Sequence, residues 1–293
     1  GQWVDGDFVR FRYGLPEKIG GWKQLTEAQE TLPGVARAQH AFTSFTGEKY
    51  VAIGTSQGLF LYYEGAFYDI SPLDDQVSGT ATFNTVQGSA NVTVNLTSHG
   101  LEAGRYITFN TMSVIPNGFT SSDTFTEGAF EIRNVTSNSF DITTPTVAVN
   151  PGGSSTGSAT VQPYEVVGPT FQTAGYGWGT YQWNTGTWGT ARTTSNVILD
   201  PGNWSLDNFG EVLVATIFNG KTFTWNAGAA TPRSFRASTT TTNFNTTNNP
   251  TATRVSLVSD RDRHLFHFGT ETTIGDATTQ DPMFVRFSNQ EDL

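Results

Sequence analysis

The 293-residue chain contains no cysteine. It can therefore form neither disulfides nor thiolate metal sites, which excludes a secreted scaffold stabilised by disulfides. Charged residues are also scarce, at 14% of the chain. Stability has to come from a packed core or from association with other chains, and the length is sufficient for a full core in one large domain or in several smaller ones.

Basic residues are in the minority. Sixteen Lys and Arg stand against 26 Asp and Glu, which gives a net charge of −10. A surface that grips nucleic acid needs basic side chains that displace phosphate counterions, so this balance argues against DNA binding. The wall of a channel through which DNA slides must instead not bind DNA, and acidic groups on that wall would repel the phosphates. The ordinary solubility of an acidic protein explains the same charge.

Long apolar runs are also missing. No run approaches the ~18 residues that a membrane-spanning helix requires, and the chain does not open with the charged and then apolar pattern of a secretory signal. No extended helical period is visible either. We therefore expect a soluble chain without a membrane span and with little helix.

Glycine, Thr, Ser and Asn are abundant, and aromatic residues reach 13%, a composition that favours turns and pleated strands. Two short apolar strands joined by a turn or loop occur three times, at 50–63, 212–225 and 264–287. Such repeated hairpins indicate the blades of a propeller-like fold. The predicted fold class is all-β, with β-propeller-like blades.

The composition changes in the middle of the chain. Residues 79–161 contain neither Trp nor Lys, and short strands of Thr, Ser, Asn and Val recur about every ten residues, as in a small β-sandwich or barrel. We predict an inserted β-sandwich domain at 77–163 between two parts of the propeller-like domain, 1–76 and 164–293. The alternative is that 77–163 forms a second lobe of the same β domain. The predicted core of the inserted domain is Phe83, Val94, Ile107, Phe109, Phe130, Ile132 and Phe140.

Two further tracts have unusual compositions. Glycine alternates with aromatic residues at 175–188, which suits either packing between blades or a surface that stacks on sugars. The Thr/Asn-rich tract 239–253 is too polar for a core of its own and is predicted as a long surface loop. Packing is the preferred interpretation of the large aromatic residues in the strands. We therefore expect Trp3, Trp22, Phe60, Trp225, Phe266 and Phe287 to be buried.

The sequence contains little that indicates catalysis. His264 and His267 are three apart on a predicted strand, so they face opposite sides and cannot share a metal. No HExxH, GxSxG or phosphate-binding loop is present. Acids cluster at 74–75, 260–262 and 291–292, but a glycosidase needs two carboxylates at a defined separation, and adjacent acids are more often solvated turn residues. We predict no enzymatic activity, cofactor or metal.

Segments at the two ends of the chain carry distinctive motifs. Residues 263–292 contain RHLFHFG, a loop that ends in Gln-Asp-Pro at 280–282, and VRFSNQED; residues 3–22 contain WVDGDFVRFR and GLPEKIGGW. Both resemble segments of the tail nozzle proteins of short-tailed bacteriophages, also called packaged-DNA stabilisation proteins. Phe287 stands where that family usually has Trp, and Asn289 stands where it has Asp.

The resemblance implies a structural protein of the virion tail, a nozzle or tube ring subunit that retains packaged DNA and forms the conduit for its ejection. Its implied partners are copies of itself in a closed, hexameric ring, the neighbouring tail adaptor and fibre proteins, and DNA only as transiting cargo. The protein would be made in the cytoplasm of a bacterial host. Members of that family are longer than this chain. The rival hypothesis is a carbohydrate-binding adhesin or glycosidase on a β scaffold.

If DNA passes through such a ring, its channel should be acidic or neutral, because each exposed Lys or Arg would add a phosphate contact. A channel lined by Arg10, Arg12, Arg233 and Arg236 would contradict this hypothesis. The candidate channel-facing acids are Asp74, Asp75, Asp207, Asp276, Glu291 and Asp292.

Overall fold

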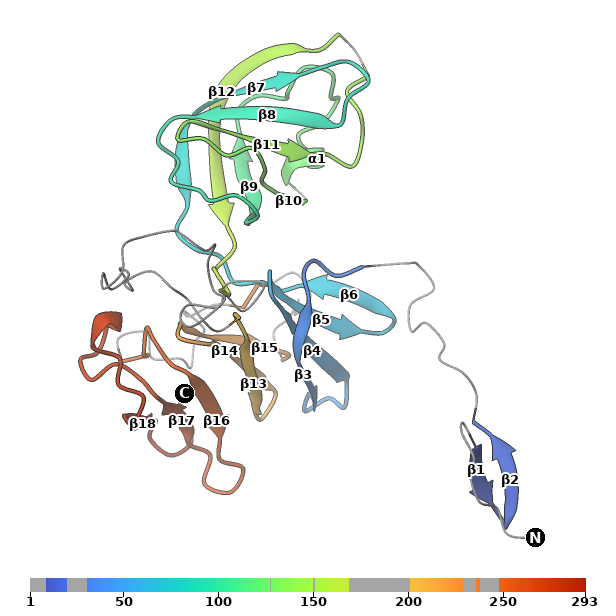
Figure 1. The fold of residues 1–293 in the computed structure, drawn as a ribbon, viewed down its shortest axis with the longest axis vertical. Helices are drawn as coiled ribbons and strands as arrows, with labels where there is room; N and C mark the ends of the chain where they lie inside the picture. The colour runs from blue at the N-terminus through green and yellow to red at the C-terminus, as the bar shows by residue number, and fades with distance from the viewer. Residues whose placement is uncertain are drawn as a thin grey trace, which may run out of the picture.

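The computed structural model describes residues 9–19, 31–126, 128–149, 151–168, 201–228, 236–237 and 248–293. Within these ranges the protein is almost entirely β, with five sheets in which all paired strands are antiparallel. Figure 1 shows the small sheets below a larger sheet that curls on itself. The predicted all-β class is confirmed. None of the described helices is long and apolar enough to cross a membrane.

The four-stranded sheet is a meander of consecutive strands. A two-residue turn joins its last two strands, and Glu64 and Gly65 both have positive φ there, at 47° and 89°. Two consecutive positive φ values are typical of the hairpin turn that matches the twist of the strands. The strands are β3 (Ala36–Thr43), β4 (Lys49–Thr55), β5 (Leu59–Tyr63) and β6 (Ala66–Asp69).

Two three-stranded sheets follow later in the chain. The three predicted hairpins pair as expected, β4 with β5, β14 with β15 and β17 with β18. The last hairpin has a long connection that contains a short 3-10 helix, η2 (Ala277–Thr279). The two sheets consist of β13 (Trp204–Phe209), β14 (Val212–Ile217) and β15 (Thr222–Asn226), and of β16 (Val255–Val258), β17 (Leu265–Phe268) and β18 (Val285–Phe287).

Trp204 joins the four-stranded sheet to β13–β15. Its side chain packs on Gly54 of β4, and its indole N–H donates to the carbonyl oxygen of Thr55 at 2.8 Å. Around it, Tyr50 and Trp225 meet edge to face with their ring centroids 5.5 Å apart. These residues belong to one buried cluster, so the two sheets share a hydrophobic core.

The fifth sheet curls into a nearly closed barrel. Its strand order is β10-β9-β12-β7-β8-β11, and Arg133, just after β10, forms a bridge with Asp141 of the opposite edge strand β11. The short helix α1 (Asp123–Thr126) places Phe125 in the interior. The strands are β7 (Val77–Thr85), β8 (Asn91–Leu96), β9 (Tyr106–Met112), β10 (Ala129–Glu131), β11 (Ser139–Thr143) and β12 (Gly153–Pro163).

The barrel-like sheet has a core of its own. In the described part of the chain, its strands form ladders only with one another. The seven residues predicted for this core are all buried in a single cluster, which confirms that prediction: Phe83, Val94, Ile107, Phe109, Phe130, Ile132 and Phe140.

A separate two-stranded hairpin lies near the N-terminus. It consists of β1 (Val9–Arg12) and β2 (Leu15–Lys18), joined by a turn in which Tyr13 and Gly14 have φ values of 53° and 79°. Figure 1 shows this hairpin apart from the other sheets.

The prediction of buried aromatic residues is wrong at one position. Phe60 and Trp225 are buried, but Phe287 is 66% exposed and Phe266 is half-buried. The reason is that alternation along a strand separates its two faces without showing which face another layer covers. Trp3 and Trp22, the tract at 175–188 and most of the Thr/Asn tract lie outside the described residues.

We predict that Gly54→Ala destabilises the protein by about 1–3 kcal/mol, because an added methyl group must displace a packed side chain. The new Cβ would lie 2.5 Å from Cδ1 of Trp204. The matched control is Gly79→Ala in β7, whose new Cβ would meet only the end of the Leu96 side chain. Urea unfolding measures both variants, and equal losses of stability would contradict the role of Gly54.

Candidate functional site

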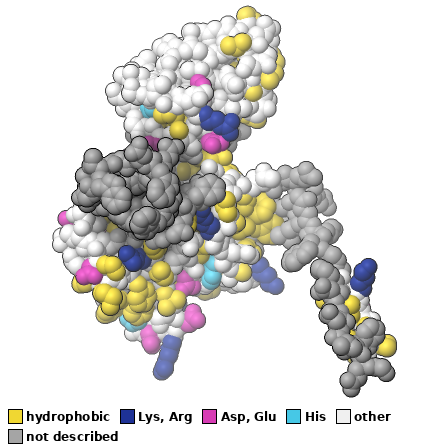
Figure 2. All heavy atoms as spheres, in the orientation of Figure 1, with side chains coloured by type: hydrophobic (Ala, Val, Ile, Leu, Met, Phe, Trp, Pro, Cys, Tyr) yellow, Lys and Arg dark blue, Asp and Glu magenta, His cyan; other side chains and the backbone are white. Residues whose placement is uncertain are grey.

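The sheet β16–β18 carries an apolar outer face. In its register Val255, Phe268 and Val285 form one row across the three strands, and Leu257, Phe266 and Phe287 form the next. Figure 2 shows hydrophobic side chains gathered over this sheet. We call these six residues the outer face. Their exposed fractions are 47% for Val255, 52% for Leu257, 38% for Phe268, 46% for Val285 and 66% for Phe287, and Phe266 is half-buried.

The opposite face of this sheet is partly polar and packs against the protein. Ser256 Oγ lies 2.6 Å from Thr216 Oγ1 of β14, and Ser205 Oγ of β13 donates to the Ser256 carbonyl oxygen at 2.8 Å. The Val258 amide donates to Asp207 Oδ2 at 2.7 Å. The contact between the Ser256 and Thr216 side chains places the Ser256 face inward, so the apolar side chains of the other face stay outside. A contiguous exposed apolar patch marks an interaction surface.

A buried carboxylate holds the long connection between β17 and β18. Glu271 accepts hydrogen bonds from the amides of Thr251, Ala252 and Gly275 at 2.9, 2.9 and 3.1 Å. Burial favours the protonated acid, but these backbone donors outweigh it and lower the pKa of Glu271. The Arg286 guanidinium donates to the Glu271 carbonyl oxygen at 3.0 Å. The connection between β17 and β18, which borders the outer face, is therefore held by several hydrogen bonds.

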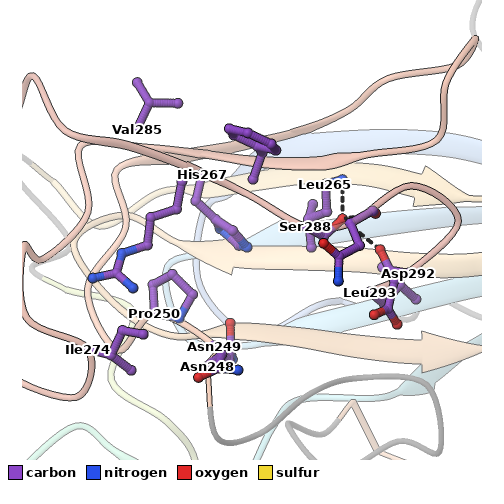
Figure 3. A pocket seen from close by; sticks show the side chains of 13 residues that line it. Asn248, Asn249, Pro250, Leu265, His267, Ile274, Val285, Ser288, Asp292 and Leu293 are labelled. Carbon is purple, nitrogen blue, oxygen red and sulfur yellow. Dashed lines mark hydrogen bonds between the residues drawn. The ribbon is translucent and has the colours of Figure 1, made fainter.

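A cavity of about 440 Å³ lies beside this sheet. Figure 3 shows His267 and Asn249 among the side chains that line it. Among the described residues, neither His267 Nδ1 nor Asn249 Oδ1 has a hydrogen-bond partner. Burial lowers the pKa of His267 to about 4, so its imidazole is neutral at pH 7. No group of three metal-binding side chains occurs in the described ranges.

A second cavity, of about 590 Å³, lies where the barrel-like sheet joins the small sheets. Two ion pairs flank it, Asp74 with Arg105 at 3.0 Å and Glu165 with Lys221 at 2.7 Å. Burial opposes ionisation of Asp74, but the hydrogen bonds from the Asp75 amide and from Arg105 outweigh it and lower its pKa. The charges in this cleft are therefore largely paired.

A third ion pair fixes the same junction. Arg236 pairs with Asp69 at 3.2 Å and donates to the Tyr164 hydroxyl at 3.2 Å. That hydroxyl in turn donates to Asp69. Burial, and then the negative charge of Asp69, raise the pKa of Tyr164. These contacts join the end of the barrel-like sheet to β6, and we interpret their role as structural.

The six candidate channel acids belong to separate parts of the molecule. Asp74 and Asp75 line the second cavity. Asp207 belongs to β13 and accepts a hydrogen bond from the Val258 amide of β16. The Asp276 side chain caps η2. Glu291 pairs with Arg263 at 3.2 Å, and Asp292, which is exposed, follows it.

The arginines whose exposure would argue against a DNA channel are also dispersed. Arg10 pairs with Glu17 at 3.0 Å within the β1–β2 hairpin, where Arg12 lies over the Tyr13 ring. Arg236 belongs to the junction described above, and Arg233 lies outside the described residues.

The exposed outer face was not predicted from the sequence, although the sequence contains a pattern that indicates it. In β16, β17 and β18 the residues on one face are all Val, Leu or Phe, whereas Ser256, His267 and Arg286 share a row on the other face. An antiparallel sheet that packs on a core with one face usually has apolar residues on that face and polar residues on the solvent face. Here a row of three polar residues lies on the inner face, and the outer face is apolar. Pairing the strands in register would have shown this pattern.

We predict that stability falls on acidification because of His267. Its pKa is about 4 in the folded protein and about 6.5 in the unfolded chain, so the unfolded chain binds more protons between these values. The free energy of unfolding should therefore drop by about 2 kcal/mol from pH 7.5 to pH 5. In this range the neighbouring Glu271 keeps its charge, because its pKa is lowered.

Urea unfolding at the two pH values tests this, with His267→Gln expected to abolish most of the drop. The control His264→Gln leaves His267 in place and should keep it. An unchanged pH dependence in His267→Gln would contradict the prediction.

Comparisons with known proteins give little similarity. No family model and no curated protein matches the chain. Among solved structures, the phage phi92 endosialidase is similar, with 12% sequence identity, a TM-score of 0.24, and coverage of 94% of this chain and 40% of that chain. This chain thus spans less than half the length of that protein. A TM-score of this size does not establish a common fold, and no function is transferred from it.

Proposed function

We propose that the protein is a structural subunit of a bacteriophage tail, part of the nozzle or tube ring that retains packaged DNA and guides its ejection. The observation that carries the proposal is the apolar outer face of β16–β18. Its strands β17 and β18 lie within residues 263–292, one of the two segments that resemble nozzle proteins. An exposed apolar face of this kind suits a protein that works in an assembly.

The energy of the outer face favours burial against a partner. Removing a Val, Leu or Phe side chain from water contributes about 1.5–3 kcal/mol when burial is complete, and five of the six residues are more than one-third exposed. Subunits of a closed ring meet through two different surfaces, and rotation closes the series of contacts. The outer face would serve as one of these two surfaces.

The proposed mechanism is steric and electrostatic and requires no catalysis. The chain carries a net charge of −10, so a channel through the ring would not hold DNA by phosphate contacts. Asp75 and Asp292 are exposed and are the candidate acids with the most freedom to face such a channel. The proposed partners are further copies in a hexameric ring, tail adaptor and fibre proteins, and DNA in transit. The proposed location is the virion tail, after synthesis in the cytoplasm of a bacterial host.

Mass measurement of the purified full chain over a range of concentrations tests the assembly. We expect a closed oligomer of defined size, and negative-stain images should show a ring with a central channel. A monomer at every concentration would contradict the proposal.

We predict that Leu257→Asp and Phe287→Asp each prevent this assembly, because a carboxylate in a buried apolar contact is costly. Both side chains are exposed in the single chain, so the thermal stability of the monomer should change by less than about 0.5 kcal/mol. The matched control is Val86→Asp, which changes a 67% exposed apolar residue of the barrel-like sheet region. Loss of assembly in the control as well, or its retention in both outer-face variants, would argue against the outer face.

A further inference from the structure

We propose that the cavity beside β17 and β18 binds an uncharged saccharide unit. The cavity lies between the inner side chains of β17 and the segment 248–250 (Figure 3). This inference goes beyond the proposed tail function and does not depend on the proposed ring. It rests on the polar atoms, the apolar walls and the charge of the cavity, which are taken in turn.

The interior of the cavity contains a buried side chain with an unused polar atom. His267 is only 5% exposed, and Figure 3 shows its ring reaching into the cavity. Its Nδ1 has no hydrogen-bond partner among the described residues. Asn249 lines the same cavity; its Nδ2 donates to the Thr222 carbonyl oxygen at 3.2 Å, and its buried Oδ1 is likewise unpaired within the described ranges. Buried polar atoms without partners are costly, so an occupant that bonds to them is stabilising.

Water alone is a poor occupant of this cavity. Its volume of about 440 Å³ has room for about ten or more waters at about 30 Å³ each. Pro250, Leu265 and Leu293 in its lining are apolar and buried, so most of these waters would lack the polar partners that hold an ordered water. Replacing poorly ordered water by apolar groups favours binding. The expected ligand therefore has apolar surface as well as polar groups.

The charge of the lining favours an uncharged ligand. Among the described residues that line the cavity, Arg286 and Asp292 are the charged ones, and His267 is neutral at pH 7 because burial lowers its pKa to about 4. The Arg286 guanidinium already donates to the carbonyl oxygens of Glu271 and Thr272, at 3.0 and 3.2 Å. Asp292 is exposed at the rim. A charged ligand would lose its hydration inside the cavity without gaining a free opposite charge there.

Polar side chains at the rim favour hydroxyl groups. Asn248, Asn289 and Asp292 are exposed, and in the part of the chain that the structure describes their side chains make no hydrogen bond. The Asn amides donate and accept, whereas the Asp carboxylate only accepts. A hydroxyl donates and accepts through one atom, so it matches all of these groups and either tautomer of His267. A pyranose ring carries hydroxyls around its edge and C–H groups on its faces, which fits both the polar rim and the apolar walls.

Ligand-observed NMR with the purified full chain at pH 7.5 tests this inference. The probes are methyl α-D-glucopyranoside, methyl α-D-galactopyranoside and N-acetyl-D-glucosamine, and the uncharged peptide analogue N-acetylglycinamide serves for comparison. We expect at least one of the three saccharides to bind with a dissociation constant on the order of 1 mM, as is usual for a ligand of this size. It should bind more tightly than the peptide analogue.

Variants locate the bound saccharide. Ile274→Trp places a larger side chain at the cavity wall, where Ile274 is 43% exposed, and should weaken binding at least tenfold; Val86→Trp, in the barrel-like sheet region, should not. Asn289→Ala should weaken binding about two- to tenfold through the loss of a hydrogen bond. The matched control is Asn95→Ala, which removes another exposed Asn side chain, in β8.

His267→Phe retains a ring and removes Nδ1, and it should weaken binding about tenfold. Thermal unfolding shows whether this buried variant folds, and if it does not, Ile274→Trp and Asn289→Ala decide. The inference is overturned if no saccharide binds at tenfold higher concentration, if the peptide analogue binds more tightly, or if Ile274→Trp and Asn289→Ala bind like the unchanged chain. A chain that stays monomeric refutes the ring and leaves this inference in place.

Discussion

The orientation of one small sheet, β16–β18, leaves its apolar face exposed. Three hydrogen bonds hold β16 of the sheet β16–β18 against β13 and β14. Ser205 Oγ donates to the Ser256 carbonyl oxygen, the Val258 amide donates to Asp207, and the Ser256 and Thr216 hydroxyls bond to each other. Turning the sheet over would break these bonds and leave buried polar groups without partners, at about 1–3 kcal/mol each. The alternative is to leave the apolar outer face in water. In the proposed assembly, a neighbouring subunit would resolve this conflict, because it would cover the outer face without disturbing the inner one.

Contacts in the rest of the described chain position that surface. Trp204 fastens β13 to the four-stranded sheet, and β13 and β14 in turn carry β16. The Glu271 carboxylate fixes the long connection before β18 with three backbone hydrogen bonds. Ion pairs at Asp69, Asp74 and Glu165 join the barrel-like sheet to the same body. Polar contacts thus position the apolar face, and the aromatic core holds the sheets that carry it.

Much of the fold could be predicted from the sequence, because period-two alternation and turn residues are local signals. They identified the three hairpins and the core of the barrel-like sheet, including Phe83 and Phe109. The exposure of Phe287 could not be predicted, since it depends on which face of the last sheet another layer covers. The candidate acids were predicted as turn residues, and a partner such as the Val258 amide, which donates to Asp207, is distant in the sequence. A channel lining is a property of several copies, which one chain does not encode locally.

A cryo-EM reconstruction of the full chain at an assembling concentration tests the central claim most directly. The account predicts a closed ring in which Leu257 and Phe287 are buried against a neighbouring copy and the central channel is not basic. Particles in which the outer face of β16–β18 remains in solvent, or in which arginines line the channel, would contradict it.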